Sequence, residues 1–598
     1  MIRNLSTTSS FDMKAFMQVA RKQIPADMVI YNARIVNVFS KQVLSGEIAI
    51  YRNRIAGIAY RDRGEIPYAG VREIDAQGAY VIPGLIDAHL HIESSMVTPT
   101  VLSSVLLSHG VTSAVCDPHE IANATGTEGI DFMLEDAEKA DVDYFFMIPS
   151  SVPSCDFETN GAGEFLASDM NSYLSRNNVL GLAEVMRFTD VLDMDQRMED
   201  KLTLFDHGRG KWILDGHAPG LSRADLQAYR AAGISNDHEA VNAYEAIERI
   251  QNGFQLFIRE GSGARNLEGL LGGLLAHGMP LNHCSFCTDD KHIEDMIEEG
   301  TIDWCLRKAV AMGTDPIDAI MMGTINTAMH YGLKSKGAIA PGYDADLVIV
   351  NDLKSFEILD VIKDGVSVSD ETFGNHKIEQ PAVPETLKKY ALEESVKLPR
   401  LNVSDIEDAL DRRHLIEVVD GQLLTIHRDA LQEPDLLYED DLNLVVAVER
   451  YGKSGQFAAG LLKGFCLKGG AIAASYAHDS HNVIAAGDSA QDIVIALNEL
   501  ERIQGGFVLV ENGSVYQSLA LPVAGLMSAE PAQKVSETAD RMKEKAREMG
   551  VPKTIDPFAH LSFLSLPVIP EIRITPQGMY DVVHQCFFSE TDKQNLDG

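Results

Sequence analysis

Between about residues 80 and 330, the chain repeats one pattern of apolar run, short loop and helical stretch. The apolar runs are nearly continuous, which is typical of strands that are buried on both faces of a parallel sheet. Stretches with helical periodicity, such as GIDFMLEDAEKA and EAVNAYEAIERIQNG, separate these runs. The succession predicts an α/β fold with a (β/α)8 barrel over residues 81–330.

Polar residues gather directly after the predicted strands of this barrel. The eight strand segments are AYVIPGLIDAHLH, GVTSAVCDPHE, DYFFMIPSSVP, VLGLAEVM, KWILDGHAPG, GISNDHE, FQLFIREGS and PLNHCSFCTDD. Barrels of this kind carry their chemistry at the carboxyl ends of the strands. The sequence therefore predicts a functional site at that end.

Both flanks of the barrel have a different pattern. Residues 27–80 alternate apolar and polar positions between turn residues, and a similar pattern returns at GAIAPGYDADLVIV and VIKDGVSV. We expect one small β domain made of residues 27–80 plus 331–380, preceded by a lead-in at 1–26. A Pro- and charge-rich stretch then precedes residues 400–598, in which strands alternate with an amphipathic helix at 488–504. This region is expected to be a C-terminal α+β domain.

Charge and composition narrow the class of protein. The net charge of −37 argues against a nucleic-acid partner, because phosphates would be repelled. The chain has no apolar run long enough to span a bilayer and no apolar segment typical of a secretory signal, so we expect a cytoplasmic protein with no membrane partner. The seven cysteines are scattered, which favours a reducing compartment. Cys284 and Cys287 are interpreted as core residues of a strand.

The first candidate chemistry is the segment DAHLH, which contains His89 and His91. Alternate residues of a strand point to the same side, so both imidazoles can bind one metal ion. A lone His-x-His pair is a weak indication of a metal site. It gains weight because polar residues also follow four later strands, namely Glu184, His217, His238 and Asp289. Taken singly, each of these could instead be a helix cap or a histidine satisfied in the core.

The ordered set of strand-end ligands resembles the amidohydrolase superfamily. Within it, the chain resembles the long bacterial adenine deaminases through PGLIDAHLHIESSM, VCDPHEIANATG, LDGHAPGL, SNDHEA and AHDSHN. The resemblance extends over nearly the full length, including the C-terminal region. It implies a flanking β-sandwich, hydrolytic deamination of adenine to hypoxanthine and ammonia, and a role in purine salvage and adenine catabolism.

One position departs from the commonest pattern of the superfamily. Many binuclear members bridge their metals with a modified Lys on the fourth strand, where this chain has Glu184. The resemblance implies two divalent ions (Mn²⁺, Fe²⁺ or Zn²⁺) per chain. His89, His91 and Asp289 would bind one ion, His217 and His238 the other, and Glu184 both. Imidazole and carboxylate ligands suit all three metals.

The resemblance also suggests roles in the reaction. Asp289 would be the general base, and Glu184 or Glu120 the proton donor, although Glu120 could equally be a salt-bridge or capping residue. Ser94, Ser95 and Arg259 are candidate substrate contacts. The alternatives are a helix N-cap for the serines and a salt bridge at the barrel rim for Arg259.

The segment AHDSHN contributes a second polar cluster, His478, Asp479 and His481. It would supply substrate contacts or a further metal site if the C-terminal domain closes over the barrel. A surface loop is the alternative.

Two other functions remain open at this stage. One is a cyclic amidohydrolase of the hydantoinase or dihydroorotase kind, which usually has the strand-four Lys. The other is a non-catalytic metal-binding relative. We expect a homodimer, although no self-complementary patch can be identified in the sequence.

Overall fold

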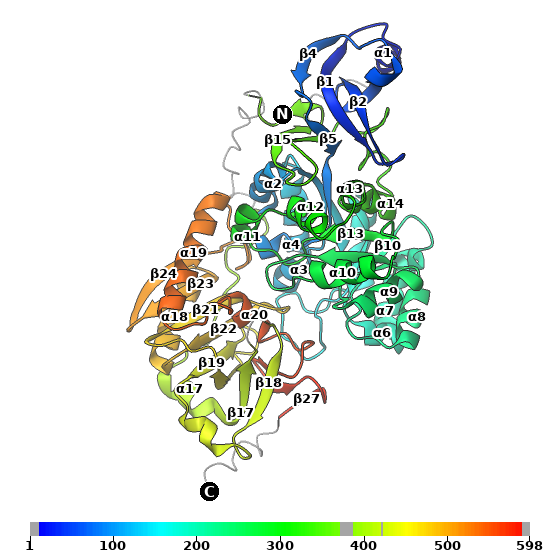
Figure 1. Ribbon diagram of the computed structural model, residues 1–598. Helices are drawn as coiled ribbons and strands as arrows, with labels where there is room; N and C mark the ends of the chain where they lie inside the picture. Colours follow the sequence, from blue (N-terminus) through cyan, green and yellow to red (C-terminus); the bar gives the residue numbers. More distant parts are fainter. Residues whose placement is uncertain (1–10, 371–386, 420–421, 589–598) are drawn as a thin grey trace.

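The computed structural model describes residues 11–370, 387–419 and 422–588. Figure 1 shows a central barrel, a sheet built around the first strands, and a large C-terminal region beside the barrel. Part of the expected linker (371–386), the first ten residues and the last ten residues lie outside the described residues. Among the described residues, no helix is both long enough and apolar enough to cross a membrane.

Eight parallel strands form the barrel. Most of their side chains are buried, which explains their continuous apolar runs. The ring closes where the Asp289 N–H donates to the His89 carbonyl at 3.0 Å, and where the Ser235 N–H donates to the Leu214 carbonyl at 2.9 Å. The strands are β6 (Leu85–Leu90), β7 (Val111–Cys116), β8 (Asp143–Ile148), β9 (Val179–Val185), β10 (Ile213–Gly216), β11 (Asn236–Asp237), β12 (Gln255–Arg259) and β13 (Cys284–Cys287).

Helices surround the barrel. Their first turns are fixed by local sequence: the Ser222 side chain accepts from the Asp225 N–H to cap α8, and Asn242 accepts from the Glu245 N–H to cap α9. The helices are α2 (Pro99–Ser108), α3 (His119–Thr125), α4 (Thr127–Ala137), α5 (Ala167–Met170), α6 (Phe188–Leu192), α7 (Gln196–Leu204), α8 (Arg223–Ala231), α9 (Ala243–Gln251), α10 (Leu267–Ala276), α11 (Ile293–Glu298), α12 (Ile302–Ala311), α13 (Pro316–Met322) and α14 (Ile325–His330).

A flanking sheet joins the chain before the barrel to the chain after it. Its order is β16-β15-β14-β5-β1-β2-β3, with β4 paired to β1, and it has a buried apolar core of its own. The strands are β1 (Ala26–Asn37), β2 (Gln42–Tyr51), β3 (Arg54–Tyr60), β4 (Gly70–Asp75), β5 (Tyr80–Pro83), β14 (Leu347–Val350), β15 (Ile358–Lys363) and β16 (Val366–Ser367), and helix α1 (Met13–Ala20) packs against them.

Buried ion pairs fix this sheet to the barrel. Lys336 Nζ lies 2.6 Å from both Asp143 Oδ2 and Asp346 Oδ2, and Lys363 Nζ lies 2.8 Å from Asp143 Oδ2. Asp143 begins β8 and Asp346 immediately precedes β14, so the cluster ties a barrel strand to the returning segment.

The C-terminal region contains an eight-stranded sheet of order β18-β17-β20-β19-β22-β21-β23-β24 and a three-stranded sheet, β25-β26-β27. The amphipathic helix expected at 488–504 is α18 (Ala490–Arg502), capped by Ser489. The remaining elements are α17 (Val403–Ala409), β17 (Leu410–Val418), β18 (Thr425–Asp429), β19 (Leu442–Val448), β20 (Phe457–Lys463), β21 (Gly470–Ala477), β22 (Asn482–Gly487), β23 (Gly506–Glu511), β24 (Ser514–Ala520), α19 (Ala532–Glu548), α20 (Ala559–Phe563), β25 (Ile572–Thr575), β26 (Gly578–Asp581) and β27 (Cys586–Phe587).

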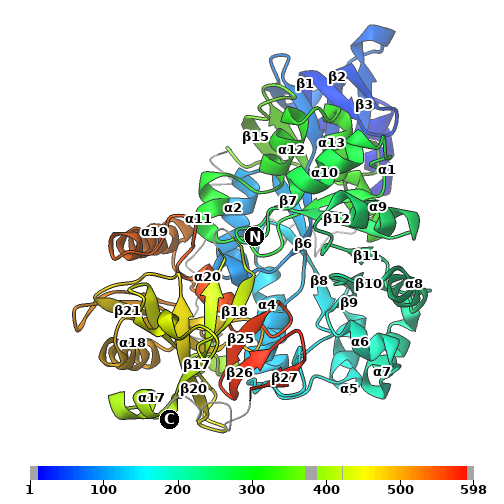
Figure 2. The same cartoon turned by 60° about the horizontal axis from the view of Figure 1, so that its bottom comes forward.

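The C-terminal region packs directly on the barrel. Figure 2 shows α19 beside α11 and α2, and these helices are in contact. Lys543 of α19 forms a buried ion pair with Glu294 of α11. Elsewhere, Lys453 Nζ donates to the Asn160 carbonyl at 2.7 Å, and Asn482 Nδ2 donates to the Thr159 carbonyl at 2.8 Å. The loop that follows β8 is therefore held between the barrel and the C-terminal region.

Candidate metal centre

His89 and His91 lie at the carboxyl end of β6, on the same side of the chain. Their Nε2 atoms are 3.1 Å apart, and both rings are buried. Asp289 follows β13, the barrel strand next to β6. Its Oδ1 lies 3.5 Å from His89 Nε2 and 3.1 Å from His91 Nε2. Closure of the barrel therefore brings the first and last strand ends together at one point.

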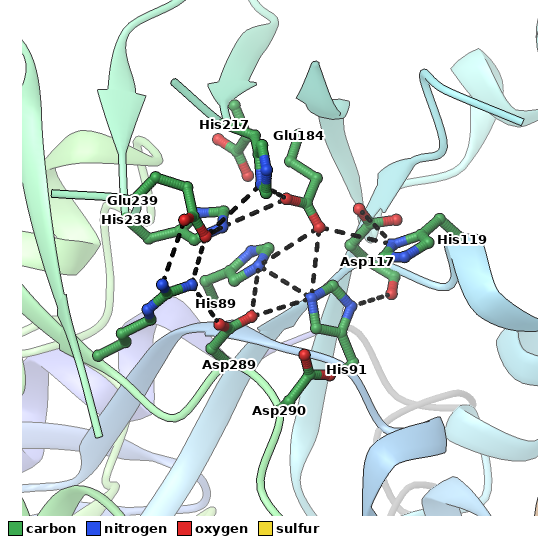
Figure 3. Close-up of polar contacts among 12 residues, drawn as sticks. His89, His91, Asp117, His119, Glu184, His217, His238, Glu239, Asp289 and Asp290 are labelled. Atoms are coloured by element: carbon green, nitrogen blue, oxygen red, sulfur yellow. Dashed lines mark hydrogen bonds and ion pairs between the residues drawn. The ribbon is translucent and has the colours of Figure 1, made fainter. Parts of the chain in front are cut away.

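Glu184, near the end of β9, lies between two groups of donors. Its Oε1 is 3.3 Å from His91 Nε2, while its Oε2 is 2.8 Å from His217 Nδ1 and 3.2 Å from His238 Nε2. Figure 3 shows these side chains converging from different strands. One carboxylate thus presents one oxygen to each group, the arrangement expected of a ligand shared by two cations.

The spacing of these donors fits metal ligation. Metal–ligand bonds of about 2.1 Å at tetrahedral or octahedral angles place neighbouring ligand atoms roughly 3.0 to 3.4 Å apart. Most of the separations around Glu184, His91 and Asp289 fall in or near this range. Three convergent sets suit an ion: His89, His91 and Asp289; His89, Glu184 and His238; and His217, His238 and Glu239.

The electrostatics keep both acidic ligands charged. Burial alone would raise the pKa of Glu184, but the charge on His238 and hydrogen bonds from His217 and His238 hold it well below its usual value. Burial would likewise raise the pKa of Asp289, but hydrogen bonds from His89 and His91 hold it well below the usual value. Both side chains are therefore carboxylates at neutral pH, the form in which they could bind a cation.

Three residues of the cluster were not among the sequence candidates. His119 Nδ1 lies 3.1 Å from Asp117 Oδ2 and 3.5 Å from Glu184 Oε1. Asp117 and His119 form a fourth convergent set together with His91 and Glu184. Glu239 Oε1 lies 3.4 Å from His238 Nε2. The Asp-Pro-His spacing after β7, and a carboxylate directly after His238, were the indications available in the sequence.

Arg259 lies inside the cluster rather than at the barrel rim. Its Nη1 donates to Asp289 Oδ2 at 3.0 Å, and its guanidinium also binds both oxygens of Glu239. Arg259 does form the salt bridges of its alternative role, with Glu239 and Asp289, but its side chain is only 12% exposed, so they lie within the cluster and not at the rim. Arg259 connects the Asp289 side of the centre to the Glu239 side.

The two serines after the histidines differ in what they contact. Ser94 Oγ lies 3.0 Å from Glu120 Oε1 and also contacts Asp290 Oδ1, so its single proton can be donated to either carboxylate, whereas Ser95 Oγ donates to the Ile92 carbonyl at 2.6 Å. The capping alternative is wrong, because Thr98, and neither serine, occupies the N-cap position of α2. Ser94 belongs to a buried side-chain network, and Ser95 fixes the local turn.

The AHDSHN segment connects β21 to β22 and faces the barrel. His478, Asp479 and His481 are all buried, so the alternative of a surface loop is wrong. His481 Nε2 lies 3.9 Å from Glu120 Oε2. Among the described residues, none of the three belongs to a convergent metal-binding set.

Comparison with known proteins gives the family. Residues 80–282 and 259–368 match the model of the amidohydrolase family, and residues 422–586 match the adenine deaminase C-terminal domain. The chain is 42% identical over 581 residues to the adenine deaminase of Desulfitobacterium hafniense, covering 96% of this chain and 98% of that protein. The chain belongs to the adenine deaminase family. The adenine deaminase of Oceanobacillus iheyensis is 41% identical, with 95% and 96% of the two chains covered.

Solved structures give matches of low sequence identity and low TM-score. A crystal structure of an adenine deaminase has 19% identity and a TM-score of 0.43, covering 57% of this chain and 99% of that one. The β-aspartyl dipeptidase of Fervidobacterium islandicum AW-1 has 17% identity and a TM-score of 0.42, covering 57% and 96%. Membership of the adenine deaminase family thus rests on sequence, and it accounts for the C-terminal region beside the barrel.

Proposed function

We propose that this protein is an adenine aminohydrolase, which converts adenine and water to hypoxanthine and ammonia. The observation that carries the proposal is Glu184, whose two oxygens face two donor groups at the end of the barrel. Full-length similarity to relatives named adenine deaminase supports the choice of substrate. A glutamate in place of the strand-four Lys argues against a hydantoinase or dihydroorotase.

The donor set fits two divalent ions, Mn²⁺, Fe²⁺ or Zn²⁺. His89, His91 and Asp289 would hold one and His217 and His238 the other, with Glu184 shared. Glu239 and the Asp117–His119 pair lie close enough to contribute. A divalent ion held by these residues would lower the pKa of water to about 7 and so would supply a nucleophile at neutral pH.

The chain's own carboxylates would move the protons. Asp289 is oriented through its Oδ2 by Arg259, so its Oδ1 is fixed toward His91, where it would take the proton of the attacking water. Addition of the hydroxyl at C6 requires a proton on the ring nitrogen, and breaking the C6–N bond requires a second proton on the leaving amine. Glu184 and Glu120 are the candidate donors, and Ser94 holds Glu120 through its Oε1.

The biological setting forms the finer part of the proposal. We place the enzyme in purine salvage and adenine catabolism in the cytoplasm, acting as a homodimer. We also propose the division into a flanking β domain (27–80 plus 331–380), a barrel (81–330) and a C-terminal domain (400–598). The separate sheets support this division, as does an apolar cluster of its own in each sheet, while the largest apolar cluster runs from the barrel into the C-terminal region. Light scattering of the purified protein tests the dimer.

A direct assay tests the activity. Apoenzyme loaded in turn with Mn²⁺, Fe²⁺ or Zn²⁺ should deplete the ultraviolet absorbance of adenine and release ammonia in equal amounts. A chelated sample should do neither, and dihydroorotate and hydantoin should not be hydrolysed. Metal-loaded protein that leaves adenine intact would refute the proposal. Elemental analysis of the same samples gives the number of ions per chain.

A further inference from the structure

A buried hydrogen-bond path crosses from the barrel to the C-terminal region. Tyr476, on β21, donates from its hydroxyl to Ser94 Oγ at 2.8 Å, and Ser94 Oγ in turn contacts a carboxylate oxygen of Glu120 and one of Asp290, with a single proton to donate to either. Asp290 directly follows Asp289, a predicted metal ligand, and Figure 3 shows it beside His91. The path therefore runs from the edge of the metal centre to the C-terminal region without leaving the interior.

Two polar groups face one another at the far end of this path. Glu120 Oε2 and both ring nitrogens of His481 are buried, and none of them has a hydrogen-bond partner among the described residues. Glu120 Oε2 and His481 Nε2 are 3.9 Å apart, which is too long for a direct hydrogen bond. Leaving such groups unpaired costs about 1 to 3 kcal/mol each, so a partner is expected for them when the protein works.

A third metal ion does not account for this pair. His478, Asp479 and His481 lie in one short segment, but with Glu120 they form no convergent donor set among the described residues. His478 stacks on Phe563 with ring centroids 4.3 Å apart, which directs its flat face to an apolar partner. The buried atoms of Glu120 and His481 thus remain available for hydrogen bonds.

We propose that Glu120 of the barrel and His481 of the C-terminal region bind neighbouring atoms of the purine ring edge, so that the C-terminal region completes the substrate site. This inference rests on the proposed function. A carboxylate accepts from a ring N–H, and a neutral imidazole has one donor and one acceptor, which suits the alternating ring nitrogens of adenine. Two protein atoms 3.9 Å apart can each reach one of two adjacent atoms on such an edge. Tyr476 is a positioning residue, because it acts on Glu120 through Ser94.

The test combines substitutions with ring analogues. His481→Leu removes the polar ring atoms, and His481→Asn restores a donor and an acceptor in a residue that tolerates the left-handed φ of 49° at this position. His414→Leu is the matched control, since His414 is a buried histidine of the same region that contacts His427 and Phe588 instead of the barrel. The substrates are adenine and three analogues. In two of them one ring nitrogen is replaced by C–H (3-deazaadenine and 7-deazaadenine), and in the third the N9 proton is replaced by methyl.

We expect His481→Leu to raise KM for adenine roughly 10- to 100-fold while kcat changes less than about threefold. His481→Asn should recover part of the loss, and His414→Leu should behave as wild type. For the analogue that is altered at the ring position bound by His481, the wild type should have a KM at least about tenfold higher than for adenine. In His481→Leu, this difference in KM between the analogue and adenine should disappear. Tyr476→Phe, which removes a single hydroxyl, should raise KM in the same direction.

Other results would overturn the inference. If His481→Leu keeps the wild-type discrimination at every ring position, His481 does not contact the ring. If His481→Leu fails to fold, Tyr476→Phe is measured by the same set of analogues, and an unchanged KM overturns the shared site. If the wild type does not turn over adenine at all, the proposed function fails instead. Calorimetric dissociation constants for the same analogues then decide whether His481 binds a purine.

Discussion

Arg259 holds one oxygen of Asp289 and leaves the other to the metal site: Nη1 lies 3.0 Å from Oδ2, while Oδ1 faces the histidines of β6. Because both side chains are nearly buried, removing the guanidinium leaves uncompensated charge on Asp289 and Glu239. We expect Arg259→Met to lower the free energy of unfolding by about 3 to 5 kcal/mol and to lower kcat.

Arg259→Lys is the matched variant, since it keeps the charge but cannot bind Glu239 and Asp289 together. It should fold nearly as well as the wild type yet remain less active. Urea unfolding and initial rates check both variants, and wild-type rates for Arg259→Lys would show that charge alone is needed.

Asp289→Asn tests the general base. The amide keeps the size of the side chain and an oxygen ligand but cannot take up a proton from water. We expect metal to remain largely bound and kcat to fall at least about 100-fold. Initial rates and elemental analysis of one preparation measure both quantities. A loss of only a few fold would move the base to another residue, and loss of metal would make Asp289 chiefly a ligand.

Glu184→Gln tests the shared ligand. Its two oxygens serve different donor groups, so an amide nitrogen in place of one oxygen should weaken one ion more than the other. We expect elemental analysis to give close to one ion per chain, together with a large loss of activity. His89→Ala, which removes a proposed ligand outright, should lose both metal and activity. Two tightly held ions in Glu184→Gln would rule out bridging.

Glu294 and Lys543 predict a pH dependence of the contact between barrel and C-terminal region. Burial would raise the pKa of Glu294, but the charge on Lys543 and a hydrogen bond from His292 lower it to about 2. This pKa lies below the usual glutamate value of about 4.3. At any pH above about 4.3, the ion pair therefore contributes its full stabilisation to the folded protein. The stabilisation is then lost as the pH falls toward 2.

Thermal unfolding of wild type and Glu294→Gln measures this effect. The difference in Tm between the two should be largest at pH 6 to 7 and should shrink at pH 3. Glu298→Gln, on the same helix, is the control and should show no such change. A gap that stays constant with pH would mean that the carboxylate of Glu294 does not titrate differently in the folded protein.

The barrel and most of its inward side chains could be predicted because each strand is an apolar run that ends at a polar residue. Apolar runs end in His89, Glu184, His217 and Asp289, and parallel strands bring their ends to one edge. The structure brings these residues together with His238, although only metal analysis tests their role as ligands. Strand order alone therefore predicted that these side chains would meet, while their assignment to individual ions came from the resemblance.

Glu239 and His119 could not be predicted by the same logic. β11 has only two residues, so the chain turns before strand alternation can direct Glu239 away from His238. His119 begins a helix after β7, and its approach to Glu184 depends on the angle of that helix. The position of His481 depends on how two regions dock, and no local pattern contains that information.

The flanking sheet has a consequence for how the chain is made. β5 pairs with β14, yet Pro83 ends the first strand and Leu347 begins the second. At 5 to 20 residues per second, the ribosome needs roughly 15 to 50 s to add the residues between them. During that time, the open edge of β5 waits unpaired on the nascent chain, where it can pair with other chains. Expression at low temperature, or with chaperones that shield strand edges, should therefore raise the yield of folded enzyme.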